Sequence, residues 1–170
     1  EHTETEGFAP LGVYGQTKAA GDIAVGQAPR HYILRSSWVI GQGHNFVKTM
    51  MGLSDRVADP GEALDQVTVV DDQFGRLTFT RDMAGAIFHL LGSAAPYGTY
   101  NLTGSGAVKS WKDIAAMVFD LANGNGQAVK PVSTQQYFES AKGPVSPRPE
   151  YSALDLSKIE AAGYTPADWE

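Results

Sequence analysis

The alternation of two kinds of apolar segment along the chain constrains the fold more than any other feature. The run HYILRSSWVIG (31–41) is rich in β-branched and aromatic residues and ends in glycine, which is typical of a buried strand. The next segment, NFVKTMMGLS (45–54), has the pattern of a helix with Asn45 as its N-cap. Because segments of the two kinds continue to alternate, the sequence predicts an α/β fold with some parallel strand pairing.

Caps and turn residues place the other elements. The clearest helix is 110–126, where Ser110 caps the first turn, Asp113 lies three residues further on, and a glycine-rich segment ends the helix. Thr80 is expected to cap a helix over 80–93. The other expected helices are 13–26, 134–141 and 156–164, and the other expected strands are 66–72, 98–106 and 128–133.

The alternation begins with a helix and lacks a glycine-rich phosphate turn. A doubly wound dinucleotide-binding sheet normally opens with a strand and the pattern G-x-G-x-x-G. The nearest segment, GQGHNF (41–46), lacks the third glycine and leads in the wrong direction. We therefore expect the phosphate-binding half of a dinucleotide fold to be missing from these 170 residues.

Composition and charge exclude several classes of protein. The formal net charge of −6 gives no general attraction to nucleic acid or to an anionic membrane. The chain has no cysteine, which excludes disulfides and thiolate catalysis. No segment approaches the roughly 20 apolar residues of a membrane span, and the polar start EHTETEGFAP is unlike a signal peptide. We expect a single cytoplasmic domain over residues 1–170.

Acidic and histidine side chains give no sign of a metal site. No group of them has the spacing of metal ligands, so we predict no catalytic metal. Asp71 and Asp72 are adjacent, and on a strand they would point to opposite faces. They are therefore not expected to form a paired-carboxylate site.

Tyr14 and Lys18, in the segment VYGQTKAAGD (13–22), form the strongest candidate catalytic pair. On a helix, residues four apart share a face, so the two side chains can meet. A nearby ammonium favours the phenolate and lowers the pKa of a tyrosine, which suits that tyrosine to proton transfer at neutral pH. The spacing alone is a weak signal, and an exposed aromatic beside a lysine is the plainer interpretation.

The surrounding residues strengthen the catalytic interpretation. The segment PLGVYGQTKAAGD (10–22) resembles the catalytic-helix segment of extended short-chain dehydrogenases/reductases, and more narrowly of the dTDP-4-dehydrorhamnose reductase family, with Asp22 in place of the usual Glu. Four later segments resemble the same family in the same order, with Leu77 where proline is usual. They are LRSSWVIGQGHNFVKTM (34–50), VVDDQFGRLTFTRDMA (69–84), GTYNLTGSGAVKSWKDIA (98–115) and PRPEYSALDLSKI (147–159).

The resemblance implies a fold, a reaction and a cofactor. It implies the C-terminal part of a Rossmann-like NAD(P)-binding fold without its N-terminal dinucleotide-binding strands. The family transfers hydride from NADPH or NADH to C4 of dTDP-4-dehydro-L-rhamnose, giving dTDP-L-rhamnose. By resemblance, Tyr14 is the proton donor and contacts the cofactor, and Lys18 lowers the pKa of Tyr14 and holds the nicotinamide ribose.

Four further residues are candidates for binding the dTDP-sugar. By resemblance, Trp38 lies against the sugar, although a core aromatic is the alternative. Asn45 opens a helix where a diphosphate could bind, or is a plain cap. Gln73 and Arg76 lie in DDQFGR (71–76), where an arginine fork suits a diphosphate and a solvated turn is the alternative.

Three interpretations of the function stay open. The first is a dTDP-4-dehydrorhamnose reductase. By resemblance, the family's catalytic Ser or Thr lies about two dozen residues before the Tyr, and only 13 residues precede Tyr14 here. The 170-residue chain alone should therefore show little or no turnover and weak cofactor affinity. The second is a non-catalytic, reductase-like regulatory subunit. The third is another nucleotide-sugar epimerase or dehydratase of the superfamily. An uncovered sheet edge would also favour a homo-oligomer.

Overall fold

The computed structural model describes residues 1–140 and 145–170, which form two compact units. Unit 1 comprises residues 1–39, 76–107 and 146–170, and unit 2 comprises residues 40–75 and 108–145. The prediction of a single domain over residues 1–170 stays a prediction.

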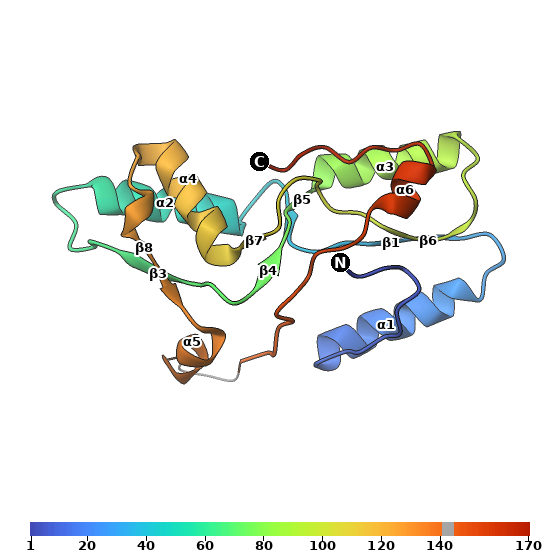
Figure 1. Cartoon of the computed structure of the whole chain (residues 1–170), viewed down its shortest axis with the longest axis horizontal. Helices are drawn as coiled ribbons and strands as arrows, with labels where there is room; N and C mark the ends of the chain where they lie inside the picture. The colour runs from blue at the N-terminus through green and yellow to red at the C-terminus, as the bar shows by residue number, and fades with distance from the viewer. Residues whose placement is uncertain (141–144) are drawn as a thin grey trace. The chain divides into compact units, whose positions relative to one another are not determined.

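Unit 1 is built on a pair of parallel strands. Strand β1 (Tyr32–Arg35) pairs with β6 (Gly98–Asn101), with Tyr32 opposite Gly98 and Arg35 opposite Asn101. Helix α1 lies on one side of this pair, and α3 and α6 lie on the other (Figure 1). The bounds of these helices are Val13–Gly26 for α1, Thr80–Gly92 for α3 and Ser157–Ala161 for α6.

The core of unit 1 forms between β6 and the helices α3 and α6. Leu90 of α3, Leu102 just after β6 and Ile159 of α6 are all fully buried in one cluster. Tyr32 and Leu34 of β1 pack against the same cluster. The hydrophobic effect therefore holds α3 and α6 against the strand pair, whereas none of the 14 residues of α1, all of which the structure describes, is buried.

Unit 2 is built on a second pair of parallel strands. Strand β3 (Val67–Val70) pairs with β8 (Val129–Val132), and Met50, Val69, Ala115, Phe119 and Val129 form the core. The helices are α2 (Phe46–Ala58), α4 (Trp111–Asn123), η1 (Gly126–Ala128) and α5 (Thr134–Ser140). The short strands β4 (Phe74–Gly75) and β7 (Lys109–Ser110) pair antiparallel.

Most of the expected helices are confirmed. Helix α1 has the predicted bounds, the Asn45 side chain caps α2 by accepting from the Lys48 amide, and the Ser110 hydroxyl caps α4 by accepting from the Asp113 amide. The Thr80 cap is wrong, because Thr80 is already helical and Phe79 occupies the N-cap position without a side-chain bond. Ala141, the last residue of one expected helix, lies outside the described residues.

The expected continuous strand over 31–41 is wrong in one respect. Pairing stops at Arg35 and a separate short strand, β2 (Val39–Ile40), follows; β5 (Thr78–Phe79) is another such short strand. Between β1 and β2, Trp38 has a φ of 48°, a left-handed backbone that cannot continue a strand. Among the described residues, no helix combines the length and apolar character needed to cross a bilayer.

Candidate functional site

The predicted catalytic pair lies on the exposed side of unit 1. Tyr14 is in the first turn of α1 and Lys18 is one turn later, so both side chains project from the same face of the helix. Both are exposed, and Tyr14 keeps 74% of its surface accessible. A phenol and an ammonium in this arrangement are accessible to a ligand, and their catalytic roles stay a prediction.

Close contacts fix the start of α1. A Cβ added at Gly15 would lie 3.1 Å from the Cβ of Pro10, so the glycine lets the preceding segment fold back against the first turn. The Thr17 hydroxyl donates to the Tyr14 carbonyl at 2.8 Å, within the helix. The backbone that carries Tyr14 is therefore held by its own neighbours in sequence.

An ion pair ties the second half of α1 to strand β1. Arg35 Nε donates to Asp22 Oδ2 at 2.8 Å, and each side chain is about three-quarters buried, with 26% and 23% exposed. The Arg35 guanidinium also lies 4.7 Å from the centre of the Phe8 ring, close enough for a cation–π contact. Arg35 thus joins α1 and the segment before it to the end of β1.

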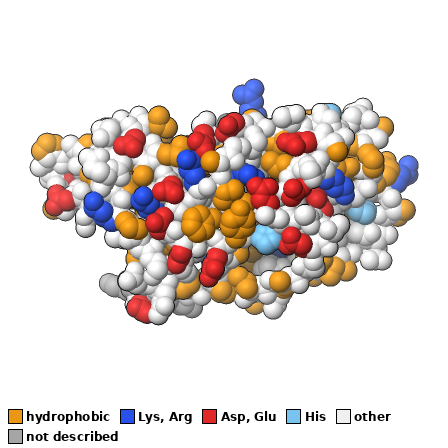
Figure 2. Space-filling model, in the orientation of Figure 1, with side chains coloured by type: hydrophobic (Ala, Val, Ile, Leu, Met, Phe, Trp, Pro, Cys, Tyr) orange, Lys and Arg blue, Asp and Glu red, His pale blue; other side chains and the backbone are white. Residues whose placement is uncertain are grey.

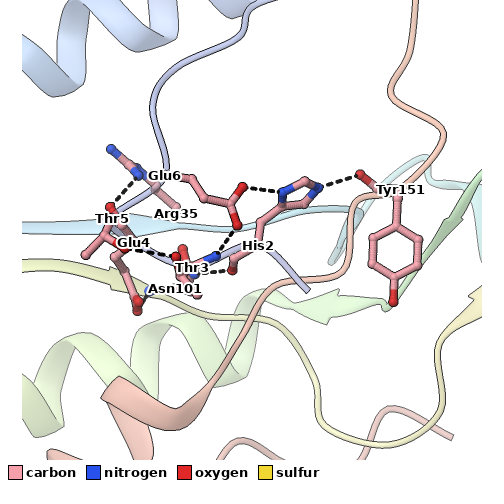
Figure 3. Close-up of polar contacts among 8 residues, drawn as sticks. All are labelled: His2, Thr3, Glu4, Thr5, Glu6, Arg35, Asn101 and Tyr151. Atoms are coloured by element: carbon pink, nitrogen blue, oxygen red, sulfur yellow. Dashed lines mark hydrogen bonds and ion pairs between the residues drawn. The ribbon is translucent and has the colours of Figure 1, made fainter.

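The N-terminal segment forms a polar network across the ends of both strands of unit 1 (Figure 3). The Glu4 carboxylate accepts from the Asn101 amide at 2.8 Å, and the Asn101 side chain donates to the His2 carbonyl at 2.9 Å. The two His2 ring nitrogens face Glu6 Oε2 at 2.7 Å and the Tyr151 carbonyl at 3.1 Å. The hydrogen bond from His2 lowers the pKa of Glu6.

Trp38, the first predicted sugar-binding residue, has an unusual backbone at the end of β1. Its φ of 48° lies in a region that residues other than glycine seldom adopt, and such outliers cluster at functional sites. The Thr78 amide donates to the Trp38 carbonyl at 3.1 Å, and the Thr78 hydroxyl donates to the Ser37 carbonyl at 2.5 Å. Trp38 is half-buried, so its ring is partly accessible.

Arg76 is not the solvated turn residue of the alternative interpretation, and its predicted role toward a diphosphate stays a prediction. Only 12% of its side chain is exposed. Its Nε donates to the Gly106 carbonyl at 2.9 Å, Nη1 to the Leu154 carbonyl at 3.3 Å, and Nη2 to Glu1 Oε1 at 2.5 Å. The guanidinium therefore links three separate segments of unit 1.

In unit 2, the side chain of Asn45 is occupied by its own backbone surroundings. Its Oδ1 accepts from the Lys48 amide at 3.1 Å, while Nδ2 donates to the carbonyls of Gly41 at 2.8 Å and Gly43 at 3.2 Å. These three bonds are those of a helix cap that also closes the preceding turn. A ligand at this point would meet the backbone amides of the first turn of α2.

Gln73 belongs to a chain of polar side chains at the end of β3. Its Nε2 donates to the Thr134 hydroxyl at 2.9 Å, and that hydroxyl donates to Asp72 Oδ1 at 2.5 Å. The Thr134 amide also donates to the Asp72 carboxylate, at 2.9 Å to Oδ2. These bonds hold the pKa of Asp72 below its usual range, and the bond from the Thr134 hydroxyl has the largest effect.

The hydrogen bonds between Asp72 and Thr134 could not be predicted from sequence patterns. A threonine at the start of a short helix is a cap signal, yet here it is capped by an acid 62 residues away. Asp71 bonds instead to the Ser110 hydroxyl at 2.5 Å, so the two adjacent carboxylates have different partners. The absence of a paired-carboxylate site here stays a prediction.

The structure groups the six predicted site residues by unit. Tyr14, Lys18, Trp38 and Arg76 lie in unit 1, whereas Asn45 and Gln73 lie in unit 2. Within residues 1–140 and 145–170, no cluster of three or more His, Asp or Glu side chains is suited to hold a metal. Acidic side chains are spread over the visible face with basic ones among them, and do not gather into one charged patch (Figure 2).

Comparisons with known proteins agree with the resemblance found in the sequence. The model of the family described as "RmlD substrate binding domain" matches residues 1–170. A curated dTDP-4-dehydrorhamnose reductase from Aggregatibacter actinomycetemcomitans is 37% identical over 183 residues, which cover 100% of this chain and 58% of the relative. The spore coat polysaccharide biosynthesis protein SpsK of Bacillus subtilis is 34% identical over 170 residues, which cover 99% of this chain and 54% of the relative.

Solved structures confirm the α/β fold class. The dTDP-4-dehydrorhamnose reductase of Bacillus anthracis, solved in complex with NADP, has a TM-score of 0.81 and 32% identity over 98% of this chain and 55% of its own. The reductase ortholog from Clostridium acetobutylicum has a TM-score of 0.83 and 32% identity over 99% of this chain and 55% of its own.

This chain spans only about half the length of the curated relatives that it matches. The family model nevertheless covers every one of its residues. The fold, the ordered sequence segments and these matches together show that the chain belongs to the RmlD substrate binding domain family.

Proposed function

We propose that this chain is the part of an NAD(P)-dependent dTDP-4-dehydrorhamnose reductase that carries the catalytic helix and binds the dTDP-sugar. The Tyr14 and Lys18 side chains support this proposal most directly. They are exposed on one face of α1, in a chain whose whole length matches the RmlD substrate binding domain. A purely structural helix would have no need to present this pair.

The chemistry follows from the two side chains. The nicotinamide cofactor, NADPH or NADH, supplies a hydride to C4 of the 4-keto sugar. The Tyr14 phenol gives its proton to the C4 oxygen, so the ketone gains one hydride and one proton and becomes an alcohol. The Lys18 ammonium stabilises the phenolate left on Tyr14, and also donates to a ribose hydroxyl of the cofactor.

The proposed sugar-nucleotide contacts differ in what the structure leaves available. The Trp38 ring is partly accessible and can lie against the sugar. Gln73 already donates to Thr134, so its amide oxygen is the atom we propose for the ligand. Asn45 would act through the first-turn amides of α2, and Arg76 would exchange the Glu1 carboxylate for a diphosphate oxygen.

Substitution of the catalytic tyrosine tests the proposal in the natural protein that contains this sequence. Tyr14→Phe keeps the ring but removes the acidic proton, so kcat for reduction of dTDP-4-dehydro-L-rhamnose should fall by about 10²- to 10⁴-fold with little change in KM. The measurement is NADPH oxidation, followed by its absorbance. Equal rates for both proteins would remove Tyr14 from the mechanism.

Tyr97→Phe is the matched control, because Tyr97 is also an exposed tyrosine of unit 1 but lies outside α1. Its ring contact with Tyr32 survives the change, so activity should stay close to that of the unmutated protein. For the 170-residue chain alone, we expect binding of the dTDP-sugar with little or no turnover. Rapid reduction of the keto sugar by this chain would contradict that expectation.

A further inference from the structure

One buried polar side chain of unit 1, Ser37, lacks a hydrogen-bond partner among the described residues. The Ser37 hydroxyl oxygen is buried, yet among residues 1–140 and 145–170 it meets no hydrogen-bond partner. A buried hydroxyl without a partner lowers stability, and such groups are uncommon in folded proteins. The residue therefore calls for an explanation outside the packing of the chain itself.

The backbone around this hydroxyl is held in a strained conformation. Trp38, the next residue, has a φ of 48°. The fully buried Thr78 fixes the carbonyls of both Ser37 and Trp38 through its hydroxyl and its amide. Strain that is held in place by surrounding bonds occurs where geometry serves binding or catalysis. The two observations are independent, since one concerns a side chain and the other a main-chain angle.

The location of Ser37 agrees with a role in binding. It lies just beyond the carboxyl end of β1, which runs parallel to β6. In open α/β sheets, ligands bind beyond the carboxyl ends of the strands. Arg35, at the end of the same strand, already has Asp22 as its partner and Phe8 under its guanidinium, whereas the buried Ser37 hydroxyl has no partner among the described residues.

We propose that the Ser37 hydroxyl is a further ligand-binding group, which pairs with a neutral polar group of the bound ligand. A serine hydroxyl donates one hydrogen bond and accepts others, so it suits a partner that does the same. A buried charge would require a countercharge, and the hydroxyl of Thr78 beside it is neutral. This inference rests on the proposed function, which offers two such partners: a sugar hydroxyl of the dTDP-sugar and the carboxamide of the nicotinamide cofactor.

The first test measures the stability of the ligand-free chain. Ser37→Ala removes the unpaired hydroxyl, so the melting temperature should stay the same or rise by about 2–4 °C. Ser54→Ala is the matched control, because Ser54 is also buried but donates to Asn125 at 2.8 Å and accepts from Asn123 at 3.0 Å. The control should melt at a lower temperature, since it removes one hydrogen bond from each of two side-chain amides.

The second test measures binding by the same variants. Saturation-transfer NMR of the 170-residue chain with dTDP-L-rhamnose and, separately, with NADPH distinguishes the two sources of the partner group. Ser37→Ala should weaken binding of one of the two probes by about tenfold and leave the other unchanged. Ser54→Ala should bind both probes as the unmutated chain does, at a temperature where it is folded.

Each result bears on the assignment. Ser37→Ala that binds both probes normally, or that lowers the melting temperature as Ser54→Ala does, would overturn it. An unmutated chain that binds neither probe would mean that the proposed function has failed and that the Ser37 assignment fails with it. Normal binding by Ser37→Ala would reject the assignment alone.

Discussion

At the scale of single residues, unit 2 depends on a polar chain that begins at Gln73 and ends at Asp72. Thr134 is its centre: the hydroxyl accepts from Gln73 and donates to Asp72, and the amide donates to the same carboxylate. The acid thus caps α5 from a distant part of the sequence. If Gln73 contacts a ligand, this chain sets the orientation of its amide.

The Asp72 contacts predict how stability changes at low pH. Thr134 holds the folded-state pKa of Asp72 below its ordinary value of 3.8, so the unfolded chain takes up the proton first as the pH falls. The contribution of Asp72 to the free energy of unfolding is therefore fully present above about pH 4. It is lost as the pH falls through the lowered folded-state pKa. Urea unfolding between pH 6 and pH 2.5 measures it.

Asp72→Asn is the comparison variant for this prediction. It should be less stable than the unmutated chain at pH 6, by about 1 kcal/mol, because a charged acceptor is replaced by a neutral one. The difference should shrink toward zero at the acid end of the range. A gap that stayed constant with pH would show that Asp72 contributes through packing instead of charge.

Local signals predicted some residue roles and not others. The caps Asn45 and Ser110 were predicted because each bonds an amide three residues away, within reach of a sequence pattern. The contacts of Arg76 could not be predicted in this way, because its partners Gly106 and Leu154 lie 30 and 78 residues away in the sequence. Long-range contacts of this kind leave no periodic trace in one sequence.

At the scale of secondary structure, α1 is held differently from the other helices of unit 1. It has no buried side chain, whereas α3 and α6 each insert fully buried residues into the core. The Asp22–Arg35 ion pair is therefore a main attachment of the helix that carries Tyr14 and Lys18. Its loss should loosen α1 before it affects the rest of the unit.

Hydrogen exchange can measure this attachment. In Asp22→Asn, amides of α1 should exchange faster by about five- to tenfold, while amides of α3 stay protected, because α3 takes no part in the ion pair. Asp22→Glu should restore most of the protection. In a double-mutant cycle, Asp22→Asn and Arg35→Gln should show a coupling of about 1 kcal/mol. Additive effects would mean that the ion pair does not hold the helix.

The boundaries of α1 followed from its sequence, but the interruption of the strand after it did not. Apolar and β-branched residues run through 31–41 without a break, so the pattern predicts one strand. In the structure pairing ends at Arg35, Trp38 has a left-handed backbone, and the Trp38 carbonyl accepts a hydrogen bond from Thr78, which lies 40 residues later. No residue preference of tryptophan signals a positive φ.

At the scale of the whole molecule, apolar side chains on and before α1 stay exposed. Leu11, Val13, Ile23 and Val25 keep between 47% and 74% of their surface accessible. These residues fall within 15 positions of the chain, and exposed apolar surface on a helix is a feature of proteins that associate with another chain. Self-association of the 170-residue chain is therefore the expected behaviour in solution.

Light scattering after gel filtration tests this expectation. The mass of the unmutated chain should exceed 18.2 kDa and should rise with concentration. Ile23→Glu combined with Val25→Glu should shift the chain toward the monomer, because charged groups resist burial. Leu121→Glu is the control, since Leu121 is 86% exposed but lies on α4 of unit 2. A monomer at all concentrations would contradict the prediction.

The division of the chain into segments also has a consequence for the order of folding during synthesis. Unit 2 uses residues 40–75 and 108–145, so its sequence is complete while the last 25 residues of unit 1 are still to be made. The core of unit 1 needs Leu156 and Ile159 from that last segment, and β1 must wait for β6 to pair. Once residue 145 has been made, the sequence of unit 2 is complete, whereas the sheet of unit 1 still lacks the last part of its core, so the helix bearing Tyr14 would be secured late.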